Sequence, residues 1–300
     1  MNTAAVDSDR LTRFLLPHAD VRGVRVHLRD TWNTIRSHDD HLPAASALLG
    51  QAVAASALFT AHAKIEGRLS VQLSGRQQIR TLFSECTSAG TLRGILRLAD
   101  PTEPLSDDLR DATHGATLAI TIEGPGIGSR EPTRYQGLVE LSQPTLSGAF
   151  ESYFQQSEQL PTRILLAADG HSAAGLMLQQ LPGSDGDADG FNRASILLGT
   201  LSPAELLALD TDTLLHRLFH EESPELMGGQ PLRFGCSCSR ERVSGMLQSL
   251  GREEAQAAVI DGEASVRCEF CAQTYRFTPG DIDSLFTGVQ ASMDGPGRLQ

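Results

Sequence analysis

The sequence lacks the features that would place the protein in a membrane or on a nucleic acid. It contains no run of about 18 predominantly apolar residues, so no segment is expected to span a membrane. Residues 1–10 include two aspartates and no apolar stretch, so no secretory signal is expected. Basic side chains number 25 against 37 acidic ones, which argues against a general nucleic-acid binder. We therefore expect a cytoplasmic protein with no specific nucleic-acid partner and no membrane partner.

The sequence signatures of common enzyme classes are also missing. There is no G-x-S-x-G elbow, no G-x-x-x-x-G-K-[ST] loop and no H-E-x-x-H helix. The nine histidines are scattered, and only His216 and His220 have the i, i+4 spacing of a metal pair. They lie in an acidic segment, where the solvated face of a helix is the simpler interpretation. We therefore expect a protein that is not an enzyme.

Cysteine is scarce but concentrated near the C-terminus. Four of the five cysteines, Cys236, Cys238, Cys268 and Cys271, form a C-x-C pair and a C-x-x-C pair separated by 29 residues. In a reducing compartment such clusters favour metal or redox chemistry over structural disulfides, so we expect these four thiolates to bind one zinc ion. An iron–sulfur cluster fits less well, because C-x-C departs from the common ferredoxin spacings. Cys86 lies in an apolar run and is expected to be a buried strand thiol.

Residues 1–182 have the patterns of an α+β domain. A stretch rich in alanine and leucine at 43–66 predicts a helix that lies close against a sheet, and 145–159 has helical spacing as well. Short β-branched or alternating stretches predict strands of a mostly antiparallel sheet. They occur at residues 21–28, 69–73, 92–98, 118–122, 135–141, 163–168 and 175–180.

Residues 183–230, called the acidic segment below, are expected to form a helical linker. The segment starts at a Gly- and Asp-rich boundary and holds nine acidic side chains against two basic ones. A solvated linker is the simpler interpretation, and a metastable segment kept marginal by self-repulsion is the alternative. Residues 202–205, Ser-Pro-Ala-Glu, predict a capped helix. The boundary imitates a calcium loop starting at Asp185, but Ile196 stands where a carboxylate is needed, so calcium binding is not expected.

Residues 231–300 are expected to form a small zinc-binding module. Ser239 can cap a helix that ends at Gly251, residues 264–275 predict a hairpin, and Ile282 lies in a last short helix. About 70 residues with few large apolar side chains would be marginal on their own, so the metal should contribute much of the folding free energy.

A closed four-thiolate shell has no position for water, so hydrolytic catalysis is not expected. The spacing leaves two other purposes open. The commoner meaning of paired cysteines is a permanent structural zinc ribbon used for binding. In the alternative, oxidation would form two disulfides, release the zinc and unfold the module. The short spacings within the pairs favour Cys236–Cys238 and Cys268–Cys271 among the three possible pairings.

Strings spread over nearly the whole chain carry a resemblance to a known family. They are Arg-Gly-Val at 22–24, Thr-Trp at 31–32, Leu-Leu-Gly at 48–50, Glu-Gly-Arg-Leu-Ser-Val-Gln at 66–72, Leu-Arg-Gly at 92–94, Tyr-Gln-Gly-Leu-Val at 135–139, Ser-Glu-Gln-Leu-Pro-Thr at 157–162, Ala-Gly-Leu-Met-Leu-Gln at 174–179, and Cys-Glu-Phe-Cys at 268–271 with Tyr275. Together with the C-x-C pair they resemble the heat-shock protein 33 family of bacterial redox-regulated chaperones. Gln51 and Arg-Gln-Gln at 76–78 depart from the usual family residues, and neither lies near the cysteines in the sequence.

The resemblance implies a redox-regulated, ATP-independent holdase that protects thermally unfolding and oxidatively damaged proteins from irreversible aggregation. The reduced, zinc-bound form would be inactive, with the acidic segment folded onto the N-terminal sheet. Oxidation of the four cysteines to two disulfides would release zinc, unfold the C-terminal module and expose the surface that binds client proteins, with a homodimer as the expected oxidised form.

Overall fold

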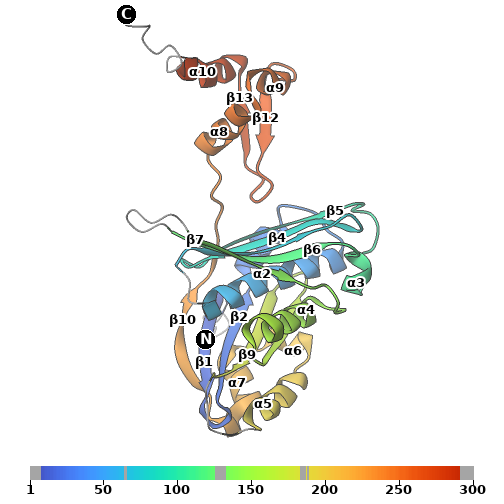
Figure 1. Cartoon of the computed structure of the whole chain (residues 1–300), viewed down its shortest axis with the longest axis vertical. Coiled ribbons are helices and arrows are strands. Elements are labelled where there is room, and N and C mark those ends of the chain that lie inside the picture. Colours follow the sequence, from blue (N-terminus) through green and yellow to red (C-terminus); the bar gives the residue numbers. More distant parts are fainter. Residues whose placement is uncertain (1–7, 64–65, 126–132, 183–186, 188, 291–300) are drawn as a thin grey trace, which may run out of the picture. The chain divides into compact units, whose positions relative to one another are not determined.

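The structure, a computed structural model, describes residues 8–63, 66–125, 133–182, 187 and 189–290. The chain divides into two compact units, residues 1–235 and residues 236–300, whose elements are labelled in Figure 1. The three-part division predicted from the sequence, with boundaries at 182/183 and 230/231, stays a prediction. It concerns the independent stability of the acidic segment, which a division by compactness does not measure.

The first unit contains two β-sheets. One consists of β1 (Arg10–Leu16), β2 (Val21–Leu28), β8 (Thr162–Ala168), β9 (Ala173–Gln180) and β10 (Glu225–Pro231). The other consists of β3 (Arg68–Ser74), β4 (Ile79–Thr87), β5 (Thr91–Leu98), β6 (Thr117–Gly124), β7 (Thr133–Val139) and β11 (Arg233–Phe234). Their strand orders are β10-β1-β2-β9-β8 and β11-β5-β4-β3-β6-β7. All neighbours are antiparallel except the short pair β11 and β5, so the predicted α+β class and mostly antiparallel pairing are confirmed.

Helix α2 (Pro43–Ala63) lies between these two sheets (Figure 1). It contacts β2, β8 and β9 on one side and β3, β4 and β5 on the other. Its alanines at 45, 52, 54, 55 and 57 are fully buried, and such small side chains let both sheets approach the helix axis closely. The hydroxyl of Ser84, on β4, donates to the carbonyl of Ala52 at 2.8 Å. The predicted helix is confirmed, and it packs against two sheets where the pattern predicted one.

The same helix also has the length and composition of a membrane span. Its most apolar 18-residue window has a mean hydropathy of 1.5, so the expectation that the sequence holds no such run is wrong. However, 83% of that window is buried inside the protein. The core helix of a water-soluble protein meets the same length and composition test, so this finding is weak evidence for a membrane span.

Three shorter helices complete the N-terminal part of the first unit: α1 (Asp30–Arg36), α3 (Leu109–Ala112) and α4 (Leu146–Tyr153), and a π-helical turn, Phe154–Glu158, extends α4. The buried Trp32 of α1 donates from its indole nitrogen to the carbonyl of Asp169 at 2.8 Å. Thr145 caps α4, because its hydroxyl accepts a hydrogen bond from the backbone of Gly148 at 3.1 Å. The helical spacing predicted at 145–159 is confirmed.

The second unit is small and has a small core. It contains α8 (Arg240–Leu250), α9 (Arg252–Ala257), the hairpin of β12 (Ala264–Arg267) with β13 (Thr274–Phe277), and α10 (Pro279–Gln290). Ser239 caps α8 as predicted, and Gly251 ends it with φ +92°. In the described part of this unit, the hydrophobic core has five buried residues, Leu247, Ala255, Ala264, Phe277 and Ile282, with partly buried neighbours around them. Such a core is little for a folded module of this length.

Within the first unit, the acidic segment folds onto the face of the five-stranded sheet opposite α2. Its helices are α5 (Gly190–Gly199), α6 (Pro203–Ala208) and α7 (Thr211–Phe219), followed by the 3-10 turn His220–Glu222. The predicted capping box at 202–205 is present, with both reciprocal hydrogen bonds. The apolar faces form a second hydrophobic core with the sheet. Its members include Phe14, Leu16, Val21, Leu176 and Leu178 from the sheet and Leu198, Leu206, Leu214, Leu218 and Phe219 from the helices.

The last part of the acidic segment is a strand that the sequence did not predict. β10 pairs with β1 at the edge of the five-stranded sheet, and most of its side chains are exposed. Its sequence, Glu-Leu-Met-Gly-Gly-Gln-Pro, has neither a β-branched residue nor a clear alternation. The pairing depends on Gly229, because a β-carbon there would come within 2.2 Å of the carbonyl oxygen of Leu11.

Arginine contacts hold the acidic segment to the sheet and join parts of the segment to each other. Arg25 of β2 is 1% exposed and donates to the hydroxyl of Thr211 at 2.8 Å and to the carbonyl of Leu209. Arg193 of α5 makes a two-pronged ion pair with Glu222, at 2.8 and 3.0 Å. The Glu222 side chain is only 5% exposed, so loss of Arg193 would leave a buried carboxylate without this ionic partner. Helix α5 is thereby joined to the turn that precedes β10.

The two arginines of the acidic segment offer a matched comparison. Arg193→Gln should loosen the segment because it leaves the Glu222 carboxylate buried without its ionic partner. Arg217→Gln removes the same charge from an exposed pair with Glu205 and should change little. We expect native-state proteolysis within residues 189–231, which tracks the opened population, to be about tenfold faster in the first variant than in the wild type. Equal cleavage of the two variants would contradict this interpretation.

Candidate metal centre

The second unit brings the four clustered cysteines together from two short stretches. Cys236 and Cys238 lie in the extended residues just before α8, and Cys268 and Cys271 lie in the turn between β12 and β13. The turn is closed by hydrogen bonds from the backbone nitrogen of Cys268 to the carbonyl of Gln273 and from that of Ala272 to the carbonyl of Cys268, each 2.9 Å long. Cys268 and Cys271 therefore present their thiols from a closed turn.

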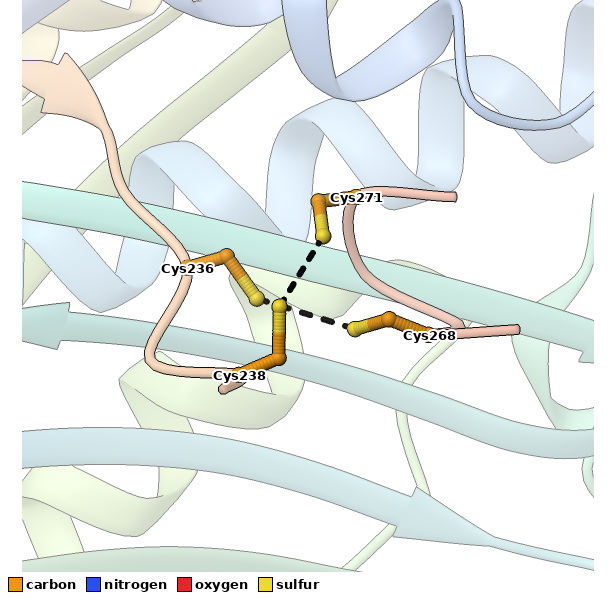
Figure 2. Close-up of side chains that lie close together, drawn as sticks. All are labelled: Cys236, Cys238, Cys268 and Cys271. Atoms are coloured by element: carbon orange, nitrogen blue, oxygen red, sulfur yellow. Dashed lines mark hydrogen bonds between the residues drawn. The ribbon is translucent and has the colours of Figure 1, made fainter. Parts of the chain in front are cut away.

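The four sulfur atoms converge on one point, as Figure 2 shows. All four lie within 4.8 Å of one another, with Cys236 Sγ 3.7 Å from Cys268 Sγ and Cys238 Sγ 3.3 Å from Cys271 Sγ. Around one tetrahedral ion with metal–sulfur bonds of about 2.3 Å, neighbouring sulfurs would be about 3.8 Å apart. The spacing of the sulfurs fits that arrangement, and the four cysteines could bind a metal ion. Their roles as zinc ligands and as disulfide partners stay predictions.

The hydrogen bonds around the sulfurs make the four thiols unequal. The hydroxyl of Tyr275 donates to Cys238 Sγ at 3.2 Å. Burial raises the pKa of Cys238, but hydrogen bonds from Tyr275 and the neighbouring thiols outweigh it and lower that pKa to about 7. Burial raises the pKa of Cys236 and of Cys271. In the absence of a metal, Cys238 is therefore the thiol that ionises most readily among these three.

The spacing of the cysteines predicts no role in the site for Tyr275. Tyr275 lies on β13, opposite Val266 of β12, and its contact with Cys238 raises its own pKa to about 12. Its position four residues after Cys271 was visible in the sequence. The contact with a cysteine 37 residues away depends on the register of the hairpin, which the sequence pattern did not give.

Arginines of α8 tie the C-x-C stretch to the hairpin. Arg242 donates from Nη1 to the hydroxyl of Ser237 at 2.8 Å. Arg240 donates from Nη1 to the carbonyl of Arg276 at 2.8 Å, and its guanidinium carbon lies 4.2 Å from the ring centre of Phe277. Cationic side chains therefore flank the stretch that carries two of the four thiols, an arrangement that favours thiolates.

The remaining candidate residues lie outside this cluster. Cys86 is fully buried on β4, as predicted, and burial raises the pKa of its thiol to about 12. His216 and His220 are both exposed on or beside α7, with ring centres 5.6 Å apart. Among the described residues, the four cysteines are the one group of three or more potential ligands whose donor atoms are close enough to share an ion.

The fold and the four-cysteine cluster together define a class of proteins in which an α+β unit is followed by a small unit with four clustered cysteines. The family model described as "Hsp33 protein" matches residues 9–278 of the chain. The chain therefore belongs to the Hsp33 family, as its sequence strings predicted.

Named relatives and a solved structure agree with that assignment. The chain is 39% identical to a "33 kDa chaperonin" of Pseudomonas fluorescens (strain SBW25), over 97% of each chain. It is 41% identical to a "33 kDa chaperonin" of Hahella chejuensis, over 93% of this chain and 97% of that one. The crystal structure of a "33 kDa chaperonin (Heat shock protein 33 homolog)" from Thermotoga maritima has the same fold, with a TM-score of 0.75 at 20% identity, over 96% of this chain and 100% of that one. Family membership supports a chaperone function.

The metal site can be tested by removing one sulfur. Cys268→Ser should abolish tight metal binding, because three cysteines and a weakly coordinating hydroxyl no longer form a closed thiolate shell. Cys86→Ala should keep about one ion per chain, because Cys86 lies on β4, outside the cluster. Metal content after gel filtration, measured by mass spectrometry, checks both. Full metal content in Cys268→Ser would show that the cluster is not the binding site.

Proposed function

We propose that this protein is a redox-regulated, ATP-independent holdase chaperone in which Cys236, Cys238, Cys268 and Cys271 are both the zinc ligands and the oxidant sensor. The observation that supports this most directly is the convergence of four free thiols in a unit whose described residues form a core of five buried hydrophobic side chains. Its place would be the cytoplasm, where thiols stay reduced until oxidative stress. Its partners would be unfolding client proteins.

The reduced state would depend on metal binding. A bound zinc ion would keep the four sulfurs deprotonated and would contribute on the order of 10 kcal/mol to the folding of a small module. The residues themselves supply the rest of the site. The closed hairpin turn and the cap at Ser239 fix the positions of the sulfurs, and the contacts of Arg240 and Arg242 hold the two stretches together.

Oxidation would convert the two cysteine pairs into two disulfides. In each pair one thiolate attacks an oxygen of a peroxide, so that an S–O bond forms, the O–O bond breaks and hydroxide leaves. The second thiolate then displaces hydroxide from the sulfenic acid and forms the S–S bond. Two electrons pass from the sulfurs to each peroxide, and two protons from solvent complete two waters. The short sequence spacings favour Cys236–Cys238 and Cys268–Cys271.

Loss of the metal would then release the surface that binds clients. A module with so small a core would unfold without the metal. The chain that continues from β11 to Cys236 would then no longer lead into a folded module. The acidic segment, held to its sheet by one apolar layer, a few arginine contacts and the pairing of β10 with β1, would then be free to leave. Its excess of carboxylates would keep it soluble while its leucines, and those of the sheet beneath, contact a client or a second copy of the oxidised protein.

A client-aggregation assay tests the proposal. Protein treated with peroxide and mild heat should suppress the aggregation of a thermally unfolding client without ATP, whereas the reduced, zinc-loaded protein should not. Reduction of the oxidised protein in the presence of zinc serves as the control for irreversible damage. Equal protection by the reduced and oxidised forms would refute the switch.

The permanent zinc ribbon remains the competing function, and zinc release separates the two. During oxidation we expect about one zinc ion to be released for every four thiols lost, as followed by a colorimetric chelator and thiol titration in parallel. Sedimentation of the oxidised protein should show a dimer. If zinc stays bound while oxidant is consumed, the cysteines form a structural site and the redox mechanism fails.

A further inference from the structure

A tyrosine hydroxyl contacts one of the four sulfurs and so bears on how easily the site is oxidised. The Tyr275 hydroxyl donates to Cys238 Sγ at 3.2 Å, which is within the distance expected for a hydrogen bond to sulfur. The Tyr275 side chain comes from β13, in the hairpin that also carries Cys268 and Cys271. The hydrogen bond therefore connects the hairpin to the C-x-C stretch without involving a metal.

The hairpin and the core of the second unit position the Tyr275 side chain for this contact. Its backbone is paired with Val266 across the hairpin, and its half-buried ring packs against the small core of the second unit. The pairing and the packing hold the ring in the position from which its hydroxyl contacts Cys238. Removal of the hydroxyl alone, as in Tyr275→Phe, would keep both the pairing and the ring.

We propose that Tyr275 restrains the oxidation of Cys238, and thereby sets how much oxidant is needed to release the metal. This inference rests on the proposed function. When Cys238 is a thiolate, the hydroxyl proton of Tyr275 lies against the electron pairs that would attack a peroxide. As the sulfur forms its bond to oxygen it loses negative charge, so the hydrogen bond weakens. The contact stabilises the starting thiolate more than the transition state, and the barrier rises.

The same contact should help to retain the metal. Hydrogen bonds to ligand atoms orient them, and their removal commonly weakens metal binding by about tenfold or more. A Tyr275→Phe protein should therefore bind zinc about tenfold more weakly in competition with a chelator. It should also release zinc about three- to tenfold faster at a fixed peroxide concentration. This is less than the full effect of losing one hydrogen bond to a charged group, because the transition state keeps part of that bond.

Thr278→Ala is the matched control for a loss of stability in the same unit. The hydroxyl of Thr278 accepts a hydrogen bond from the backbone of Asp281 at 3.1 Å and caps α10, so its removal weakens the module without touching a sulfur. Cobalt(II) in place of zinc adds a readout that stability alone does not move. The sulfur-to-cobalt charge-transfer band should shift to lower energy in Tyr275→Phe and stay in place in Thr278→Ala.

The outcomes are distinct. Faster zinc release with a shifted cobalt band in Tyr275→Phe alone would support the proposal. Unchanged release in Tyr275→Phe, or equal acceleration in both variants with no difference between their cobalt spectra, would overturn it. If the wild-type protein kept its zinc under peroxide, the proposed function itself would fail. In that case the chelator competition and the cobalt band would still show whether Tyr275 acts on the Cys238 sulfur.

Discussion

The fold of the second unit depends on the close approach of four sulfur atoms, which all lie within 4.8 Å of one another. Four thiolates cannot occupy so little space without a cation, because their mutual repulsion raises the cost of each further ionisation. The cluster can therefore hold protons, share a metal ion or form S–S bonds. These states differ in what they contribute to folding, so the chemistry at the sulfurs and the stability of the unit cannot be separated.

The two units differ in the extent of their hydrophobic cores. In residues 1–235 a helix with small side chains lies between two sheets, and most of its surface is buried. Among the described residues of the second unit, the core has five buried residues, and much of the order comes from caps, a closed turn and arginine contacts. The acidic segment lies between these extremes, because its apolar faces are well packed although its charge is unbalanced. We therefore expect the second unit to unfold under a stress that leaves the first unit folded.

The sequence predicted those elements whose cause is local. The alternating strands, the alanine-rich helix, the capping box at 202–205 and the cap at Ser239 all follow from short-range rules, and the structure confirms them. The sequence did not predict β1 and β10, whose pairing joins residues more than 200 positions apart. The division of the strands into two sheets is likewise a long-range result. At the site, the spacing identified the four cysteines, but the Tyr275 contact required the register of the hairpin.

The pairing of β10 with β1 means that the proposed release of the acidic segment would also expose backbone groups at the edge of the five-stranded sheet. β1 is covered by β2 on one side and by β10 on the other. If β10 leaves with the rest of the acidic segment, β1 becomes an edge strand with a row of unpaired N–H and C=O groups. Such an edge accepts any extended chain, whatever its side chains. A holdase built in this way would recognise the unfolded state itself, through the amide groups that every client shares.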